Sequence, residues 1–322
     1  MMKERVLYYD VAKALAILCV IIGDVYIIHD PRGVLTPIST FVHTFHTALF
    51  MFISGVFFKK ALEKDWKTVF TGKTRQLVIP YLAWSTVLLF MVSIPAHGFE
   101  NIFTTIEDYI KGGFLRNYWY LKSLFLFIIV TYVFVKVFRN DFLGSIASFV
   151  LFTFAPSVFN TALFIPYFIA GYFYGKYIEK INHWGWSLSL VIIAVALYWV
   201  WIPDYNYNIG ESMEFKPYII RTSIGIVDSI IILTALRLIC KSGGVFFTLS
   251  DVGKYTLGMY CCNCMFYEGW GKILLDSINI PSSIKCISVT FIAFILSFLL
   301  CKFFDKNKYT SLLFLGNKFR KP

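Results

Sequence analysis

Several ionisable side chains fall inside long apolar segments of the sequence. A charged group within a bilayer is costly unless it pairs or lines a water-filled cavity, so each of these side chains is a candidate for binding or catalysis. Pairing that only holds helices together is the alternative for the whole set. The residues are Asp10, Lys13, Asp24, His46, Lys122, Arg221, Asp228 and Glu268.

His46 is the candidate general base. An imidazole changes charge near neutral pH, and a neighbouring carboxylate orients it and raises its basicity. Asp24 falls at a similar depth on the preceding apolar run, so we predict that Asp24 and His46 form a catalytic dyad. The alternative is a histidine that only hydrogen-bonds between helices.

Lys13 lies on the same apolar run as Asp24. Three helical turns separate the two side chains, which places them on one face about 16 Å apart. Asp10 precedes Lys13 by one turn and is its expected salt-bridge partner. This pair is either structural or part of a ligand site.

Membrane-spanning helices must position these residues. The chain of 322 residues is 58% hydrophobic, has a mean hydropathy of +0.67 and carries 15% charged residues, against about 25% in an average soluble domain. Apolar runs long enough to cross a bilayer recur throughout and leave no room for a separate globular domain. We therefore predict an all-α, polytopic transmembrane bundle that forms a single domain over residues 1–322. About ten helices are expected, near 7–28, 41–58, 77–94, 118–138, 142–156, 161–178, 184–202, 217–238, 255–275 and 284–303.

Positive charge predicts the orientation of this bundle. Most of the 30 Lys and Arg residues fall in segments that are cytoplasmic if the N-terminus is inside, so both termini are expected in the cytoplasm. The net charge of +11 then reflects this asymmetry, and we expect no nucleic-acid partner. The basic tail from Lys302 to Lys321 is expected to lie against anionic membrane lipid. In this orientation one group of residues falls in the outer half of the membrane and predicts a polar cavity open to the outside. The group is Asp24, His46, Lys122, Arg221 and Glu268.

The cysteines give no sign of a metal site. Cys261 and Cys264 form a Cys-x-x-Cys pattern, but no second pair or nearby histidine accompanies it. We expect no bound metal.

Six blocks along the chain resemble the integral-membrane acyltransferase 3 family, in particular its branch of polysaccharide O-acetylases and intercellular-adhesion O-succinyltransferases. They occur in the family's order and span most of the sequence. The blocks are Tyr9–Leu18, Phe45–Gly55 with its Phe-His start and Ser-Gly end, Arg75 with Ile79–Trp84, Trp119–Lys122, Phe168–Gly175 and Gly253–Tyr260.

The resemblance implies an O-acyltransferase of the bacterial cytoplasmic membrane. Such an enzyme moves an acyl group from cytoplasmic acyl-CoA, with acetyl-CoA as the expected donor, to a hydroxyl of a surface polysaccharide or lipid-linked sugar. No cofactor is expected to be bound, and polysaccharide synthesis or export machinery is the expected protein partner. Lys13 and Arg75 are candidates for holding the CoA phosphates. The other candidate substrate-binding residues are Asp10, Trp119, Lys122, Arg221 and Glu268.

Two positions depart from the family pattern. Asp24 stands where the first-helix motif has a histidine, and Asn263 stands where many relatives carry another. A carboxylate accepts a proton but is a poor acyl carrier. A catalytically silent homologue and a polysaccharide export or flipping component that uses the same cavity therefore stay open as alternatives.

The predicted orientation can be tested by cysteine labelling in sealed cells. Cysteines introduced into residues 95–117 and 203–216 should react with an impermeant maleimide, because both segments are expected outside. Cysteines in residues 59–75 should react only after permeabilisation. The parent chain, with its own seven cysteines, is the control. Labelling of Lys67→Cys in sealed cells would contradict the predicted orientation.

Overall fold

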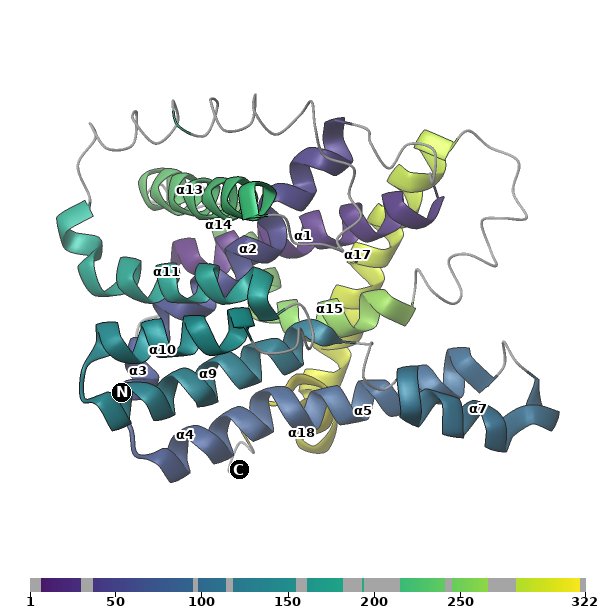
Figure 1. Ribbon diagram of the computed structural model, residues 1–322. Coiled ribbons are helices and arrows are strands. Elements are labelled where there is room, and N and C mark those ends of the chain that lie inside the picture. Colours follow the sequence, from purple (N-terminus) through teal and green to yellow (C-terminus); the bar gives the residue numbers. More distant parts are fainter. Residues whose placement is uncertain are drawn as a thin grey trace. The chain divides into compact units, whose positions relative to one another are not determined.

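The computed structural model describes residues 7–29, 37–94, 98–113, 118–154, 161–181, 193, 215–240, 245–265 and 282–318. Every regular element in these ranges is a helix, which confirms the predicted all-α class (Figure 1). The α-helices are α1 Leu7–His29, α2 Pro37–Val56, α3 Lys59–Leu62, α4 Trp66–Lys73, α5 Ile79–Leu88, α7 Ile102–Asp108, α9 Trp119–Phe138, α10 Asp141–Phe154, α11 Thr161–Ile181, α13 Phe215–Ile239, α14 Val245–Gly253, α15 Thr256–Met265, α17 Ser282–Lys306 and α18 Lys308–Leu315. Three π-helical segments, η1 Thr74–Val78, η2 Leu89–Ser93 and η4 Tyr109–Gly113, and the 3-10 helix η3 Phe99–Asn101 complete the set.

The chain forms two compact units that alternate along the sequence. The first unit contains Met1–Val20, Leu35–Lys64 and Val130–Lys254, and the second contains Ile21–Val34, Asp65–Ile129 and Tyr255–Pro322. Helices α1 and α9 contribute residues to both units. The prediction of one domain over the whole chain stays a prediction.

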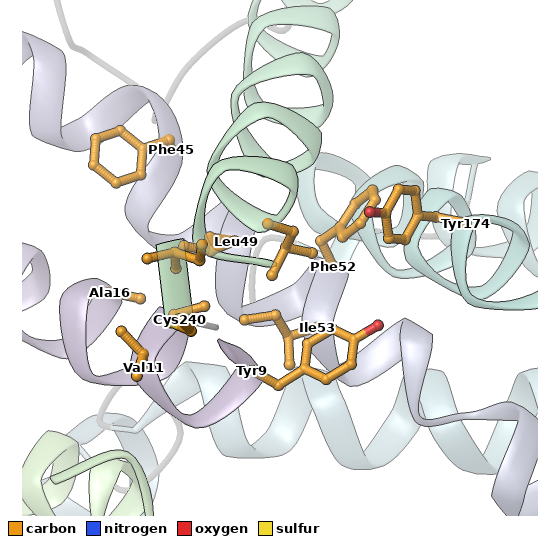
Figure 2. Packing of buried hydrophobic residues seen from close by; sticks show 12 residues of the cluster. Tyr9, Val11, Ala16, Phe45, Leu49, Phe52, Ile53, Tyr174 and Cys240 are labelled. Carbon is orange, nitrogen blue, oxygen red and sulfur yellow. The ribbon is translucent and has the colours of Figure 1, made fainter. Parts of the chain in front are cut away.

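An apolar cluster organises the first unit (Figure 2). Side chains from α1, α2, α11 and α13 converge in it, and α2 packs against both α11 and α13. Leu49 and Phe52 of α2 are completely buried, and the Phe52 and Tyr174 ring centroids are 5.3 Å apart. In a lipid surrounding, such packing stabilises the bundle through van der Waals contact, because lipid tails are as apolar as the side chains themselves.

Two glycines allow α2 and α11 to cross with their backbones in contact. A Cβ atom added to Gly55 would overlap the carbonyl group of Phe168, and one added to Gly171 would overlap the carbonyl group of Phe52. Small residues at helix crossings are the usual route to such close approach in membrane bundles. The Ser-Gly end of one sequence block and the Ala-Gly of another are therefore a packing pair.

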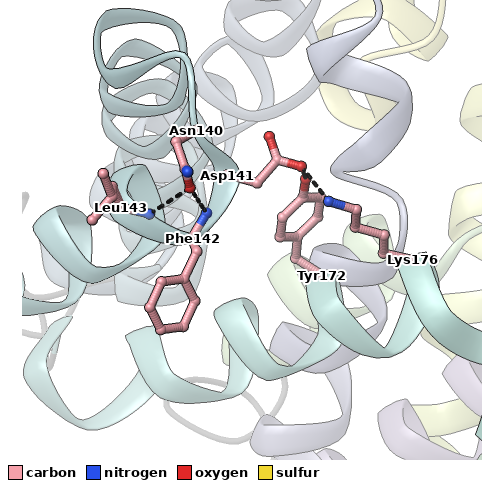
Figure 3. A network of polar contacts seen from close by, with 6 residues as sticks. All are labelled: Asn140, Asp141, Phe142, Leu143, Tyr172 and Lys176. Carbon is pink, nitrogen blue, oxygen red and sulfur yellow. Dashed lines mark hydrogen bonds and ion pairs between the residues drawn. The ribbon is translucent and has the colours of Figure 1, made fainter.

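A polar network joins α10 to α11 (Figure 3). Tyr172 and Lys176, one turn apart on α11, donate hydrogen bonds of 2.6 and 2.7 Å to Oδ2 of Asp141. Asn140 accepts hydrogen bonds from the first backbone N–H groups of α10 and so caps that helix. The network fixes where α10 begins relative to α11.

In the second unit, Trp84 of α5 anchors the C-terminal helix α18. The indole Nε1 of Trp84 donates to the backbone oxygen of Phe314 at 3.0 Å, and the two ring centroids lie 5.1 Å apart. Phe304 at the end of α17 stacks on Phe314 with a centroid distance of 4.4 Å. Three aromatic side chains thus join α5, α17 and α18.

Asp305 holds the same junction together from its polar side. Its carboxylate accepts hydrogen bonds from Tyr255 at 3.0 Å, Ser311 at 2.8 Å and Asn317 at 3.0 Å. Gly316 ends α18 in the left-handed conformation, with a φ of 65°, which favours glycine. The segment that the sequence predicted only as a basic tail is a docked helix.

The described helices have the length and surface expected in a membrane. Four stretches are long and apolar enough to cross a bilayer, namely Phe45–Leu62, Trp119–Phe138, Tyr218–Ile239 and Ile284–Lys306. Helix α17 carries exposed apolar side chains at helical spacing, as expected of a face turned to lipid. They include Ile284, Ile287, Phe291, Ile295 and Leu299.

The predicted helical runs agree with the observed helices wherever they can be compared. The run at 184–202 lies outside the described residues apart from Ile193, and the run at 255–275 is described only as far as Met265. The total of about ten spanning helices stays a prediction.

Some segments expected as loops contain short helices. The expected outer loop at 95–117 contains α7, and Tyr109, which follows α7, donates a hydrogen bond of 2.8 Å to the backbone oxygen of Ser85. Helix α4 lies in an expected inner segment and is capped by Asp65, which accepts from the backbone N–H of Thr68 at 2.9 Å. This hydrogen bond lowers the pKa of Asp65.

The glycine crossing predicts a position-specific loss of stability. Gly171→Ala should destabilise the folded protein by about 1–3 kcal/mol or more, because the new methyl group must displace the α2 backbone. Gly72→Ala is the matched control, since a Cβ atom there meets nothing within 4 Å and the change should stabilise α4 by about 0.5–1 kcal/mol. Thermal unfolding in detergent measures both. Equal melting temperatures for the two variants would contradict the crossing.

Candidate functional site

The predicted pair of Asp10 and Lys13 is present in the first unit. Lys13 Nζ donates to Asp10 Oδ1 at 3.0 Å, and the Asp10 side chain is only 5% exposed. Lys13 Nζ also lies 5.2 Å from the ring centroid of Phe57, and Lys60 Nζ lies 5.1 Å from the same centroid. Two ammonium groups thus lie near one aromatic ring, and cation–π attraction stabilises their positive charge.

Gly253 of α14 lies directly against this part of α1. A Cβ atom at Gly253 would overlap the backbone oxygen of Asp10, so the two backbones are in contact. The first and last of the six sequence blocks therefore meet at Asp10.

His46 is held in one tautomer. Its Nδ1 lies 2.6 Å from the backbone oxygen of Val42, one turn earlier on α2. A carbonyl oxygen can only accept a hydrogen bond, so Nδ1 carries the proton and Nε2 holds the lone pair of the neutral ring. In the neutral ring, Nε2 is therefore the nitrogen that can accept a proton.

Arg221 lies on α13, which packs against α2, the helix of His46. Gly225, one turn after Arg221, faces Ala48, and a Cβ atom at Gly225 would lie 2.8 Å from the Cβ atom of Ala48. The backbone oxygen of Arg221 accepts a hydrogen bond of 3.2 Å from Tyr167. Arg221 and His46 therefore both lie within about one turn of the same helix contact.

Arg75 lies in the π-helical segment η1 of the second unit. Its Nε atom is buried and, among the described residues, has no hydrogen-bond partner. Gly316 lies against its backbone, where a Cβ atom would be 2.8 Å from the Arg75 oxygen. Single π-turns occur frequently at functional sites, and a guanidinium with an unmet donor suits an anion such as phosphate.

Asp24 is paired with Asn263, also in the second unit. Asn263 Nδ2 donates to Asp24 Oδ2 at 3.0 Å. Asn263 is completely buried, and no hydrogen-bond partner for its Oδ1 is found in the described part of the chain. The two positions that depart from the family pattern are therefore in direct contact.

The start of α9 lies beside the same helix α15. The Tyr118 hydroxyl donates to the backbone oxygen of Cys261 at 3.2 Å. Trp119, half-buried, begins α9, and Lys122 one turn later lies with Nζ 5.2 Å from the ring centroid of Tyr81. Lys122 is thus stabilised by an aromatic face.

The structure divides the predicted site residues between the two units. The first unit contains Asp10, Lys13, His46 and Arg221, and the second contains Asp24, Arg75, Trp119 and Lys122. Glu268 lies outside the described residues. The dyad of Asp24 with His46 joins residues of different units and stays a prediction.

Two features of the site were missed by considering ionisable residues alone. Asn263 was noted as a departure from the family pattern, but its pairing with Asp24 was not predicted; an amide inside an apolar run was the signal for it. Tyr118 takes a positive φ of 51°, which no sequence signal predicts for a tyrosine. Within the described ranges, no group of three or more His, Cys, Asp or Glu side chains is placed to hold a metal ion.

The described helices include stretches apolar enough to cross a membrane, a buried histidine and several cationic side chains. The family model described as Acyltransferase domain, that of acyltransferase 3, matches residues 6–303. The chain therefore belongs to the acyltransferase 3 family and is by class a multi-pass membrane acyltransferase. No curated protein and no solved structure matches it significantly.

Proposed function

We propose that the protein transfers an acyl group, with acetyl as the expected group, from cytoplasmic acyl-CoA to a hydroxyl of a surface polysaccharide or lipid-linked sugar. It would act in a bacterial cytoplasmic membrane and work beside polysaccharide synthesis or export machinery. The observation that supports this proposal is the tautomer of His46, in which Nδ1 bonds to Val42 and Nε2 is the proposed base. A membrane acyltransferase needs such a base to activate an acceptor hydroxyl.

His46 Nε2 takes the proton of the acceptor hydroxyl as the oxygen attacks the thioester carbonyl. The new ester C–O bond forms, the C–S bond breaks, and the CoA thiolate leaves and takes up the proton from the imidazolium. The hydrogen bond from Nδ1 to the oxygen of Val42 stabilises the imidazolium between these two events. Asp24, as the predicted orienting carboxylate, would favour the same charged ring.

Lys13 and Arg75 are the proposed ligands of the CoA phosphates. Both fall near the cytoplasmic ends of their helices in the predicted orientation, where acyl-CoA must enter. Asp10 positions Lys13 through the ion pair, and the buried Nε–H of Arg75 can donate a hydrogen bond to a phosphate oxygen. Trp119, Lys122, Arg221 and Glu268 are the proposed acceptor-side residues.

A catalytically silent, sugar-binding homologue is the second candidate. The replacement of the family histidine by Asp24 favours it, because a carboxylate is a poor acyl carrier and Oδ2 of Asp24 already accepts a hydrogen bond from Asn263.

Acyl transfer by purified protein in nanodiscs separates the two candidates. The parent should consume acetyl-CoA in the presence of a glycan extract, and His46→Ala should lower the transfer rate at least 100-fold through loss of the base. Asp24→Asn should lower the rate strongly, and Asp24→His should retain or increase it. Thr47→Ala, the next residue on α2, is the control.

Normal transfer by folded His46→Ala would contradict the role of His46. Absence of turnover in the parent, with some activity gained in Asp24→His, would favour the silent homologue.

Donor binding makes a separate prediction. Lys13→Ala and Arg75→Ala should each weaken acetyl-CoA binding about tenfold, because each removes a charge-assisted hydrogen bond to phosphate. Arg75→Lys should restore only part of the affinity, since lysine lacks the planar two-pronged donor. Equilibrium binding measures the effect, with exposed Lys67→Ala of α4 as the control. Unchanged affinity in both alanine variants would place the donor site elsewhere.

A further inference from the structure

Asn263 presents an unmet hydrogen-bond acceptor in the interior of the second unit. The residue is completely buried, and its Oδ1 has no partner within the described residues. A buried acceptor without a partner costs free energy, so such atoms in native proteins call for a specific explanation. A bound ligand that supplies the donor is one such explanation.

Asp24 prevents the Asn263 amide from rotating by 180° to exchange the positions of Oδ1 and Nδ2. As a carboxylate, Asp24 can only accept, so Nδ2 must face it at 3.0 Å and Oδ1 must face elsewhere. Because the two atoms of one amide are about 2.3 Å apart, Oδ1 lies at most about 5.3 Å from the Asp24 oxygen. The oxygens of Asp24 and Asn263 are therefore close enough for two neighbouring donor groups of one small molecule to bind both.

Three tyrosine side chains contact one another beside the turn of α15 that leads to Asn263. The ring of Tyr260 lies edge-on to those of Tyr118 and Tyr120, with centroids 6.2 and 5.6 Å away. Tyr118 adopts a strained positive φ of 51°, and its hydroxyl is bonded to Cys261, two residues before Asn263. Strain of this kind persists where the surroundings hold a residue in place and is concentrated at functional sites.

The kind of ligand follows from the acceptor atoms. Carboxylate and amide oxygens bind hydroxyl or N–H donors, whereas they repel the oxygens of phosphate or carboxylate ligands. Aromatic side chains beside a few convergent polar groups are typical of binding sites for small neutral molecules. In the predicted orientation the end of α1 and the start of α9 lie toward the outside, the side from which an acceptor glycan arrives.

We propose that Asp24 and Asn263 form the acceptor-sugar subsite and bind two neighbouring donors, hydroxyl groups or a hydroxyl and an amide N–H, of one neutral sugar residue. Asn263 is then both a ligand of the sugar and the positioning residue of Asp24. The proposal rests on the proposed function only in naming this sugar as the acyl acceptor.

Sugar binding without acyl-CoA tests the subsite. The probes are the methyl glycosides of glucose, galactose, mannose and N-acetylglucosamine, and binding to the parent in nanodiscs is measured by saturation-transfer difference NMR. At least one glycoside should bind, and Asn263→Leu should weaken it at least tenfold. In transfer assays the same variant should raise the KM for sugar tenfold and change the KM for acetyl-CoA less than twofold.

Ser297→Ala is the control, because Ser297 is also completely buried in the second unit and donates a hydrogen bond within its own helix, to the backbone oxygen of Phe294 at 3.1 Å. It should bind sugar as the parent does. If Asn263→Leu does not fold, Asn263→Ser, whose side chain is too short to reach Asp24, should show the same loss.

The outcomes separate this subsite from the proposed function. Sugar binding that depends on Asn263 supports the subsite even if the parent transfers no acyl group. Three results would overturn it: no binding of any glycoside by the parent, parent-like affinity in folded Asn263→Leu, or an equal loss in Ser297→Ala.

Discussion

Within the hydrocarbon part of a bilayer, a polar side chain that does not line a water-filled cavity must find its partner inside the protein. The candidate site is shaped by this constraint. Lys13 finds Asp10, Asp24 finds Asn263, and His46 turns back to a carbonyl of its own helix. Each of these contacts also fixes a chemical property, because it decides which atoms remain to bind a ligand or take a proton.

Packing sets where these atoms lie. Helix α2 carries His46, and its position depends on the backbone contact that Gly55 and Gly171 allow with α11. A side chain at either glycine would push α2 away, and the imidazole would move with it. The crossing is therefore linked to chemistry although neither glycine lies near a reacting atom.

Sequence reasoning succeeded for structure and contacts that involve residues close together in the sequence. Apolar runs predicted the helices, and the spacing of Asp10 and Lys13 predicted their ion pair, because both depend on helix geometry alone. The pairing of Asp24 with Asn263 joins residues 239 positions apart and needs the tertiary fold. Helices α4, α7 and α18 were missed because short helices draw their stability from docking, which a local pattern does not encode. Whether Asp24 meets His46 depends on the two units together.

The docking of α18 has a consequence for biosynthesis. Trp84 is inserted early, yet its hydrogen-bond partner Phe314 is 230 residues further along the chain. Until the ribosome has released that segment, α5 must stay in the membrane with its indole N–H unmet by the native partner. The second unit therefore cannot complete its fold until the segment that contains Phe314 has left the ribosome.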